Sequence, residues 1–233
     1  MIRPVHIPDG FIDAPTSVGA GAVAIGGVSV CLRRASATLE ERQVPLVGLT
    51  AAFVFAAQML NFPVAAGTSG HLLGGVLAAV LVGPYAGALA VTVVLVVQSL
   101  LFADGGLSAL GLNVINMALV GALGGYAAFV ALRRALPATR AGVVLASGIA
   151  AGLAPVMASL AFVAEYSVGG NGATTLGRLT AAMVGVHLLI GVGEGVITAM
   201  TVSAVLASRP DLVHGARLAR RTPPTPVAAG AVS

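Results

Sequence analysis

The sequence predicts an all-α integral membrane protein of about seven transmembrane helices, with the N-terminus outside and the C-terminus in the cytoplasm. Of its 233 residues, 58% are hydrophobic and 9% are charged, and the mean hydropathy is +1.00. An ordinary soluble domain carries about 25% charged residues. Crossing a bilayer takes about 20 apolar residues per helix. The chain offers seven apolar stretches, at 14–32, 44–62, 70–83, 84–103, 107–132, 141–165 and 178–207.

The first stretch lacks a basic leading region and a cleavage site, so we expect a retained helix instead of a signal peptide. The third, 70–83, is short, and Gly83-Pro84 after it predicts a tight turn, since proline has no backbone donor and often opens a helix. Segments three and four are therefore expected to form a helical hairpin. Runs such as "AAVLVGPYAGALAVTVVLVV" show none of the alternation of a membrane β-barrel strand.

The arginines predict the orientation in the membrane. All twelve basic side chains are arginines, and ten of them fall into three clusters. The clusters follow the first, fifth and seventh stretches: Arg33, Arg34 and Arg42; Arg133, Arg134 and Arg140; and Arg209, Arg217, Arg220 and Arg221. Seven crossings place all three on one side, which the positive-inside rule assigns to the cytoplasm. The net charge of +4 is thus explained without a nucleic-acid surface. We expect a multi-pass protein of the bacterial cytoplasmic membrane.

The chain is expected to form a single transmembrane domain over 1–208, followed by a disordered cytoplasmic tail over 209–233. Its single cysteine, Cys31, excludes an internal disulfide and a cysteine metal site. Within the domain, residues 5–13 are expected to be a metal-binding segment at the external face.

Polar residues collect on the external face of this topology. They are His6, Asp9, Asn61, His71, Asp104 and Asn113. Irregular backbone at membrane depth is tolerated only where protein buries it or water reaches it, so we expect a shallow site there. Histidine is the commonest metal ligand near neutral pH. Each histidine taken alone is better explained as an interfacial hydrogen-bonding residue than as a ligand.

The stretch "PVHIPDGF" sharpens the metal hypothesis. A chain that begins at position 5 has its free amine next to His6, and the codon for Val5 can be GTG, which initiates as methionine. The amine, the backbone nitrogen and the imidazole of His6 would close two adjacent small chelate rings around a cation. A nitrogen of His71 would complete a planar four-nitrogen set, which suits Ni²⁺ or Cu²⁺. The sequence Pro8-Asp9-Gly10 predicts a turn back toward the membrane.

With position 5 as start, the opening resembles that of the CbiM/NikM family, the substrate-capture membrane subunits of energy-coupling-factor cobalt and nickel importers. Four further matches follow in family order: "GTSGHLLGG" at 67–75, "GPYAGAL" at 83–89, "QSLLFADGGLSALGLNVINM" at 98–117 and "GVHLLIGVGEGVIT" at 185–198. The resemblance implies a seven-helix protein in which the amine of position 5, His6 and His71 hold the ion. The extension of four residues before Val5 departs from the family pattern.

The resemblance also implies partners, namely a transmembrane coupling subunit, two ATPase subunits and often a small accessory membrane subunit. The chain has no lysine and hence no Walker A lysine, so ATP would be hydrolysed by another chain. We expect no enzymatic activity and no permanently bound cofactor, with Co²⁺ or Ni²⁺ as the transported ligand.

The remaining polar residues have two interpretations each. Gln98, Asp104, Asn113 and Asn116 are either a second shell that orients the histidines or helix caps and interhelical hydrogen bonds. His187 and Glu194 lie on one face of the last stretch. They act either as a relay for protons or metal ions, or as structural hydrogen-bonding residues that bind another helix or the accessory subunit.

Three functions other than ion capture for an importer are open to a membrane protein with these residues. A proton-coupled secondary transporter of a divalent metal would use His187 and Glu194. An intramembrane metalloprotease needs a motif such as HExxH, but leucine follows His187. A vitamin-binding subunit of the same importer class would need aromatic residues around a larger cavity, whereas aromatics are 4% of this chain and tryptophan is absent.

Overall fold

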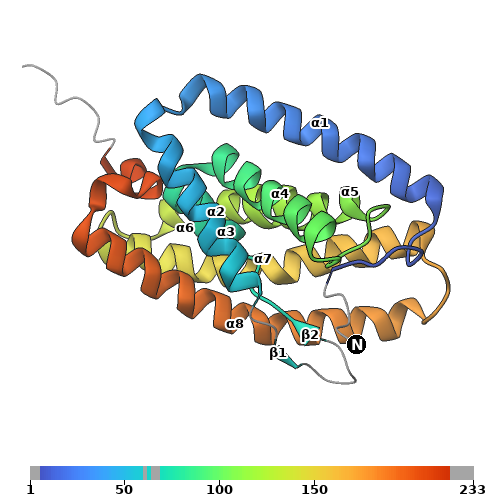
Figure 1. Ribbon diagram of the computed structural model, residues 1–233. Helices are drawn as coiled ribbons and strands as arrows, with labels where there is room; N and C mark the ends of the chain where they lie inside the picture. The colour runs from blue at the N-terminus through green and yellow to red at the C-terminus, as the bar shows by residue number, and fades with distance from the viewer. Residues whose placement is uncertain (1–5, 60–61, 64–68, 221–233) are drawn as a thin grey trace, which may run out of the picture.

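The computed structural model describes residues 6–59, 62–63 and 69–220, which form a bundle of helices (Figure 1). The elements in chain order are α1 (Ala14–Thr38), η1 (Glu41–Gln43), α2 (Val44–Gln58), β1 (Phe62–Pro63), β2 (Ser69–Gly70), α3 (Gly75–Val82), α4 (Pro84–Leu101), α5 (Leu110–Asn113), η3 (Val114–Gly124), α6 (Gly125–Ala135), α7 (Arg140–Gly169), α8 (Leu176–Ser208), η4 (Pro210–Leu212) and η5 (His214–Arg220). The two-residue strands β1 and β2 pair antiparallel.

Each predicted apolar stretch contains a helix. Five helical segments within the described residues are long and apolar enough to cross a membrane, and the continuous segment Leu110–Ala135, which joins α5, η3 and α6, counts as one of them. Helix α2 is a shorter apolar helix, and α3 has only eight residues. The all-α membrane class is therefore supported, while seven crossings and the orientation stay predictions.

The predicted turn between the third and fourth stretches is confirmed. Gly83 separates α3 from α4 with a φ of 93°, a conformation that favours glycine, and Pro84 is the first residue of α4. Side-chain caps open three of the long helices. Asp13 accepts from the backbone N–H of Thr16 at α1, and Thr139 and Thr175 act in the same way at α7 and α8.

The two longest helices, α7 and α8, pack together through glycines. A Cβ added at Gly191 of α8 would overlap the carbonyl oxygen of Gly152 in α7, and one at Gly195 would lie 2.8 Å from the carbonyl oxygen of Gly148. The two backbones can approach this closely because these positions carry no side chain.

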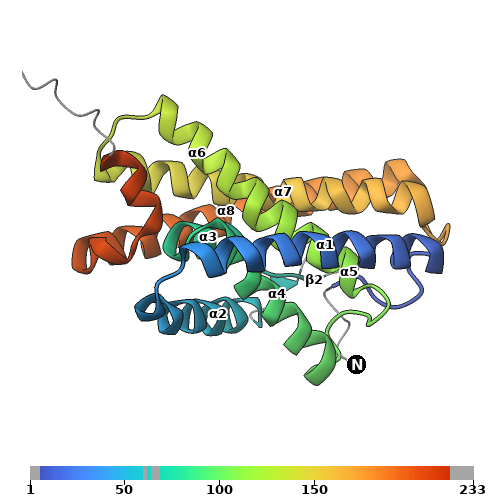
Figure 2. The same cartoon turned by 90° about the horizontal axis from the view of Figure 1, so that it is seen from above.

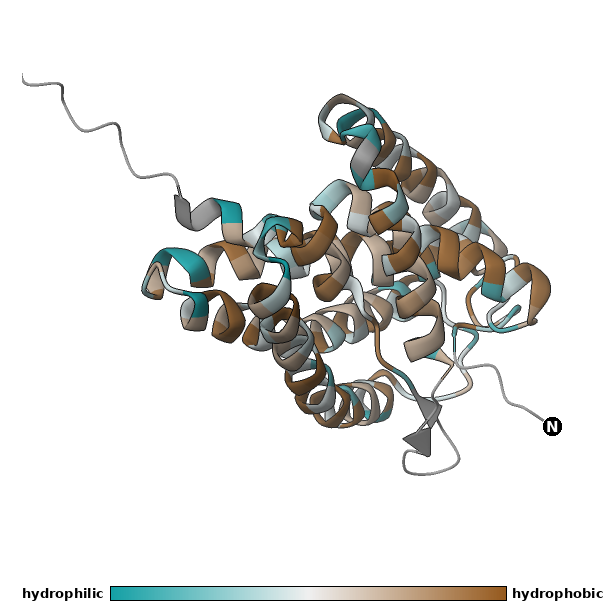
Figure 3. Cartoon of the chain, turned by 60° about the vertical axis from the view of Figure 1, so that its left-hand side comes forward, coloured by the Kyte–Doolittle hydropathy of each residue, from teal (hydrophilic) through white to brown (hydrophobic). Residues whose placement is uncertain are grey.

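The bundle has many exposed apolar side chains and a partly polar interior. Large apolar side chains face outward along several helices, as Val18, Leu101 and Leu189 do with more than 70% of their surface exposed. Polar side chains that are buried include His6, Gln58, His71, Gln98, Asn113, Asn116 and Glu194. Hydrophobic residues dominate the helices, and hydrophilic ones gather at the helix ends and in the loops (Figure 3). A continuous apolar exterior is expected for a protein whose surroundings are lipid.

The two ends of the bundle differ. The C-terminal ends of α1, α6 and α8, next to the arginine clusters, lie together at the left of Figure 1, while the N-terminal segment and the loop between α7 and α8 lie toward the right. From above, α1 runs lengthwise across the bundle and α2 lies beside α4 (Figure 2). The arginines of the three clusters that the structure describes thus lie at one end, as the predicted topology requires.

Residues 209–220 form helical turns where the sequence predicts the start of a disordered tail. Val213, between η4 and η5, is fully buried in a core cluster with Val80 and Phe129. Gly215 also contacts Phe129, so close that an added Cβ would overlap its ring. The apolar contacts of this short segment with the end of the bundle explain its ordered backbone.

Candidate metal site

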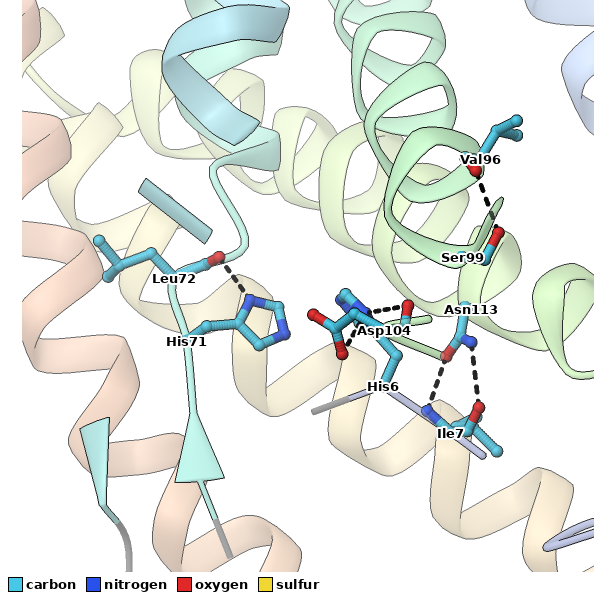
Figure 4. A network of polar contacts seen from close by, with 8 residues as sticks. All are labelled: His6, Ile7, His71, Leu72, Val96, Ser99, Asp104 and Asn113. Atoms are coloured by element: carbon cyan, nitrogen blue, oxygen red, sulfur yellow. Dashed lines mark hydrogen bonds and ion pairs between the residues drawn. The ribbon is translucent and has the colours of Figure 1, made fainter. Parts of the chain in front are cut away.

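The N-terminal segment is folded into one end of the bundle, where Asn113 holds the backbone of Ile7. The side-chain oxygen of Asn113 accepts from the Ile7 N–H at 3.1 Å, and its amide donates to the Ile7 carbonyl oxygen at 3.4 Å (Figure 4). The N–H of Gly106 donates to the same carbonyl at 2.9 Å. Three contacts from distant parts of the chain therefore fix the residue that follows His6.

Asp9 forms the next anchor. Its carboxylate accepts from the backbone N–H of Ser108 at 2.8 Å and from the Ser108 hydroxyl at 2.5 Å. These hydrogen bonds hold the pKa of Asp9 below its usual range. The predicted turn at Pro8-Asp9-Gly10 is confirmed, because the Phe11 N–H donates to the Pro8 carbonyl and Gly10 has a φ of 76°.

The segment then packs against α7 and the loop after it. The Phe11 ring lies 5.9 Å from that of Phe162 and 5.3 Å from that of Tyr166, centroid to centroid. Asn171 donates from its side chain to the Gly10 carbonyl and from its backbone to the Phe11 carbonyl. Ile12 forms an antiparallel bridge with Gly170. Polar and apolar contacts together bind the segment to the bundle.

Two glycines permit the close approach of the loop 102–109 to the segment. Gly105 has a φ of 99°, and an added Cβ there would lie 2.9 Å from the Cβ of His6. A Cβ at Gly106 would overlap the backbone of Asp9. Larger residues would therefore displace the segment from this loop.

His6 and His71, which lie 65 positions apart in the sequence, are neighbours in space. Their ring centroids are 4.7 Å apart, with the ring planes at 74° (Figure 4). Both side chains are buried, with 6% and 8% of the residue surface exposed. The sequence predicted this pair as metal ligands, and the structure brings the two imidazoles together.

Both rings engage a backbone carbonyl through Nδ1. His71 Nδ1 lies 2.8 Å from the Leu72 carbonyl oxygen, and His6 Nδ1 lies 3.2 Å from that of Asp104. A carbonyl only accepts, so Nδ1 carries the proton in both rings and Nε2 is left with a lone pair. His6 Nε2 is buried and has no hydrogen-bond partner in the described part of the chain.

The electrostatic surroundings favour neutral imidazole at His71. Burial, together with the neighbouring His6, lowers the pKa of His71 to about 3, against smaller raising effects of the Leu72 carbonyl and Asp104. A histidine that is neutral at physiological pH presents the form that coordinates a metal ion. The carboxylate of Asp104 lies 3.5 Å from His6 Nδ1 and supplies the negative charge nearest to that ring.

The loop that carries His71 is held from two helices. The Leu73 carbonyl accepts from the side-chain amide of Gln58 in α2 at 2.7 Å. The N–H groups of Leu73 and Gly74 donate to the two carboxylate oxygens of Glu194 in α8, at 2.6 and 2.8 Å. Glu194 therefore bonds to the backbone just before α3, and its predicted companion His187 instead points Nδ1 to the Met183 carbonyl at 2.7 Å.

Asn113 and Asn116 bind different partners. The side-chain amide of Asn116 donates to Glu165 of α7 at 2.7 Å, whereas Asn113 binds Ile7. Asn116 lies in η3, a π-helix with wider turns than an α-helix, and Asn113 is the last residue of α5 before it. Gln98 is fully buried, and its side-chain amide has no hydrogen-bond partner among the residues the structure describes.

Four contacting residues were not singled out from the sequence, namely Gln58, Ser108, Glu165 and Asn171. Gln58 and Glu165 stand as lone polar residues near the ends of apolar stretches, and that position is a usable signal. Ser108 and Asn171 lie in polar loops that offer many equivalent candidates, so no pattern separates them.

The predicted ligand role of Val5 lies outside the described residues, as does that of any atom before His6. Among the residues that are described, no three histidine, cysteine, aspartate or glutamate side chains converge as a metal cluster. A site built on His6 and His71 therefore needs ligands of another kind, such as backbone or terminal nitrogen.

Comparison with known proteins gives consistent similarities. Residues 6–212 match a family model described as CbiM, cobalt uptake substrate-specific transmembrane region. The chain is 42% identical to a putative fused nickel transport protein NikMN of Archaeoglobus fulgidus, over 90% of this chain and 68% of that protein. It is 33% identical to the cobalt transport protein CbiM of Sorangium cellulosum, over 94% and 99% of the two chains.

A solved structure shares the fold. The crystal structure of a truncated transition metal transporter superimposes with a TM-score of 0.78 at 31% identity, covering 87% of this chain and 98% of the other.

Proposed function

Because the chain belongs to the CbiM family of cobalt-uptake transmembrane regions, we propose that it captures Co²⁺ or Ni²⁺ as the substrate-binding subunit of an ATP-driven importer. Its relatives are named cobalt and nickel transport proteins, and its long apolar helices mark it as a multi-pass membrane protein. Capture would occur at the end of the bundle that holds the N-terminal segment, on the outer side of the bacterial cytoplasmic membrane.

The observation that carries the proposal is the histidine pair. Two buried imidazoles, with centroids 4.7 Å apart, each direct Nδ1 to a carbonyl and keep Nε2 for another partner. A buried nitrogen lone pair without a partner is costly unless a ligand uses it. The described part of the chain leaves His6 Nε2 in this state, so no hydrogen bond at that nitrogen holds the ring against turning toward an ion.

The remaining ligands in this proposal are the backbone nitrogen of His6 and the amine of position 5, if translation begins there. Closing small chelate rings uses Nδ1 of His6, because only that ring nitrogen lies near the residue's own backbone. In the structure Nδ1 faces Asp104. Chelation would therefore turn the His6 ring away from Asp104, and Asp104 would hold the ring ready before the ion arrives.

The proposed subunit has no chemistry of its own, and the energy for transport would come from partner chains. These are a transmembrane coupling subunit, two ATPase subunits and a small accessory membrane subunit. Proton coupling through His187 and Glu194 finds less support, because the two side chains bind separate partners, Met183 for the former and Leu73 with Gly74 for the latter.

Calorimetric titration of the purified protein with Ni²⁺ and Co²⁺ tests the proposal. We expect tight binding by a chain that starts at position 5, weaker binding by one that starts at Met1, and loss of binding in His71→Ala. The matched control is His214→Ala, a histidine that lies in η5 and packs against Tyr126. Unchanged binding in His71→Ala would remove the loop histidine from the site, and equal tight binding by both starts would remove the amine.

A further inference from the structure

We propose that Glu194 is a positioning residue for the ion, acting on His71 through the single peptide group that joins Leu72 to Leu73. This inference rests on the proposed function, since it assigns a role in ion capture. It assigns the buried carboxylate of α8 a task that neither the sequence nor the family comparison specifies.

One peptide group carries both hydrogen bonds. Its N–H, from Leu73, donates to Glu194 Oε2 at 2.6 Å. Its carbonyl, from Leu72, accepts from Nδ1 of His71 at 2.8 Å. The peptide is trans, so its N–H and carbonyl point in opposite directions. The carboxylate and the imidazole therefore bind opposite ends of the same peptide dipole and form one chain of hydrogen bonds with it.

This chain of hydrogen bonds from Glu194 to His71 fixes the tautomer of the His71 ring. Hydrogen bonds in series polarise one another, so the carboxylate makes the Leu72 carbonyl a stronger acceptor for the Nδ1 proton. A histidine that gives its Nδ1 proton to a strong acceptor has a more basic Nε2 with a defined direction, as metal-ligating histidines commonly do. Where a carboxylate has this role it usually binds the ring directly, whereas here the peptide group between Leu72 and Leu73 separates Glu194 from the ring.

The residues of this chain of hydrogen bonds are shielded from water. Glu194, Leu72 and Leu73 have 2%, 6% and 4% of their surface exposed. Both carboxylate oxygens accept from N–H groups, the second from Gly74 at 2.8 Å, and such double acceptance suits an ionised carboxylate. Gly74 is the N-cap of α3, so the helix dipole also favours negative charge at this place.

A cap for α3 alone would not require this arrangement. The shorter of the two bonds goes to the Leu73 N–H, which belongs to the peptide that faces His71, and Gln58 holds the carbonyl of the same residue from α2. Leu73 is thus fixed at both of its backbone polar groups by side chains of two different helices. The outcome is a rigid support directly behind the loop ligand.

The test compares Glu194→Gln with Glu165→Gln in the full chain. Both substitutions replace a carboxylate by an amide of the same shape, and Glu165 bonds to Asn116 instead of to the loop. In Glu194→Gln one of the two N–H groups faces an amide NH₂. We expect Ni²⁺ and Co²⁺ to bind about 10- to 100-fold more weakly than to the unsubstituted chain, and Glu165→Gln to bind within about threefold of it.

A second readout does not depend on the ion. The ¹⁵N chemical shifts of the His71 ring in the metal-free protein report which nitrogen carries the proton. We expect a dominant Nδ1–H form in the unsubstituted chain and in Glu165→Gln, and a loss of that dominance in Glu194→Gln. A third variant, Gln58→Leu, loosens Leu73 on its other side and leaves the peptide of interest untouched, so it should alter affinity less than Glu194→Gln and preserve the tautomer.

The outcomes separate the inference from the proposed function. If the unsubstituted chain binds the ions tightly and Glu194→Gln binds equally well with an unchanged tautomer, the inference is wrong and capture stands. Equal weakening in Glu194→Gln and Gln58→Leu would also overturn it, because general loosening of the loop would then suffice. If the unsubstituted chain binds neither ion, the proposed function fails and the inference fails with it.

Discussion

At the scale of single residues, the candidate site depends on backbone groups that side chains hold in place. Asn113 engages both polar groups of Ile7, and Glu194 engages the N–H groups of Leu73 and Gly74. Each histidine of the candidate site thus lies one or two positions before a residue whose backbone a distant side chain holds. Such placement lowers the conformational freedom that an ion would otherwise have to restrict.

Replacing Asn113 with alanine should weaken ion binding. The substitution leaves the part-buried N–H of Ile7 without its amide partner, and an unsatisfied buried group costs up to about 1–3 kcal/mol. If this cost destabilises the ion-bound protein relative to the ion-free protein, the Kd for Ni²⁺ rises about tenfold or more. Calorimetric titration gives the Kd. Asn171→Ala is the comparison, because its exposed side chain makes one bond to the N-terminal segment, to the Gly10 carbonyl, and one within its own loop, from the Ala173 N–H. An equal effect of the two variants would contradict the role assigned to Asn113.

The anchoring by Asp9 should depend on pH in the acid range. Its folded pKa lies below the ordinary 3.8 because of the hydrogen bonds from Ser108. Its contribution to stability is therefore complete above the unfolded pKa and is lost as the pH falls through the folded pKa. Thermal unfolding of the metal-free protein from neutral pH to about pH 3 should show a smaller acid-dependent loss in Asp9→Asn than in the unsubstituted chain. Parallel curves would show that Asp9 contributes nothing to the folded state.

At the scale of elements, the loop between α4 and α5 decides where the N-terminal segment lies. Its glycines contact His6 and Asp9 so closely that a methyl group would not fit. Short connections with positive φ are therefore part of the site, although they carry no ligand atom. Two glycines with similar backbone strain and different neighbours allow this contribution to be measured.

Gly105→Ala and Gly172→Ala form the matched pair. Both residues have positive φ, 99° and 75°, so alanine should cost each variant on the order of 1 kcal/mol of stability. Only the Cβ at Gly105 would meet His6, while nothing lies within 4 Å of the one at Gly172. We expect both variants to fold, Gly105→Ala with the lower thermal stability, and ion binding to weaken, by about tenfold, in Gly105→Ala alone. Equal ion affinity in both would show that contact with His6 is unimportant.

At the scale of the whole molecule, the bundle has a polar end with the candidate site and an arginine-rich end where η4 and η5 pack. Many apolar side chains cover the outside, while several polar ones are buried. This distribution suits a lipid environment, because buried polar groups must find partners inside the protein. The orientation of the two ends in the membrane is accessible to a labelling experiment.

The predicted topology places Ala173 outside and Ala138 in the cytoplasm. The single cysteine of the chain, Cys31, is 1% exposed, so Cys31→Ser provides a suitable background. In that background, a membrane-impermeant maleimide added to intact cells should label Ala173→Cys and should label Ala138→Cys only after the cells are opened. Both positions are exposed in loops. Labelling with the reverse pattern would invert the orientation and move the proposed capture site to the cytoplasmic side.

Several features of the site were predictable from the sequence because they depend on local chemistry. The turn at Pro8-Asp9-Gly10 and the break at Gly83-Pro84 follow from the backbone limits of proline and glycine. The pairing of His6 with His71 was predicted from their shared face and the family resemblance. The alternative interpretation, in which each histidine makes its own interfacial hydrogen bond, does not require the two rings to lie close together.

Other features depend on contacts between helices that no local pattern encodes. Asn113 and Asn116 lie three positions apart, yet they bind different segments, Asn113 at Ile7 and Asn116 at Glu165. Glu194 was recognised as a charge in an apolar helix, and its bonds to the start of α3 appear only when α8 and α3 are packed together. Gln58 gave no reason to expect a bond to Leu73.

The sequence by itself determined the membrane class, the apolar helical stretches and the clustering of arginines at one end, because hydropathy and backbone stiffness act within a few neighbouring residues. Tertiary structure alone decided which polar side chains meet, how the N-terminal segment is anchored and what stands behind His71. Those contacts join residues from 15 to 161 positions apart. Their geometry follows from how whole helices pack, a property that no short stretch of residues contains.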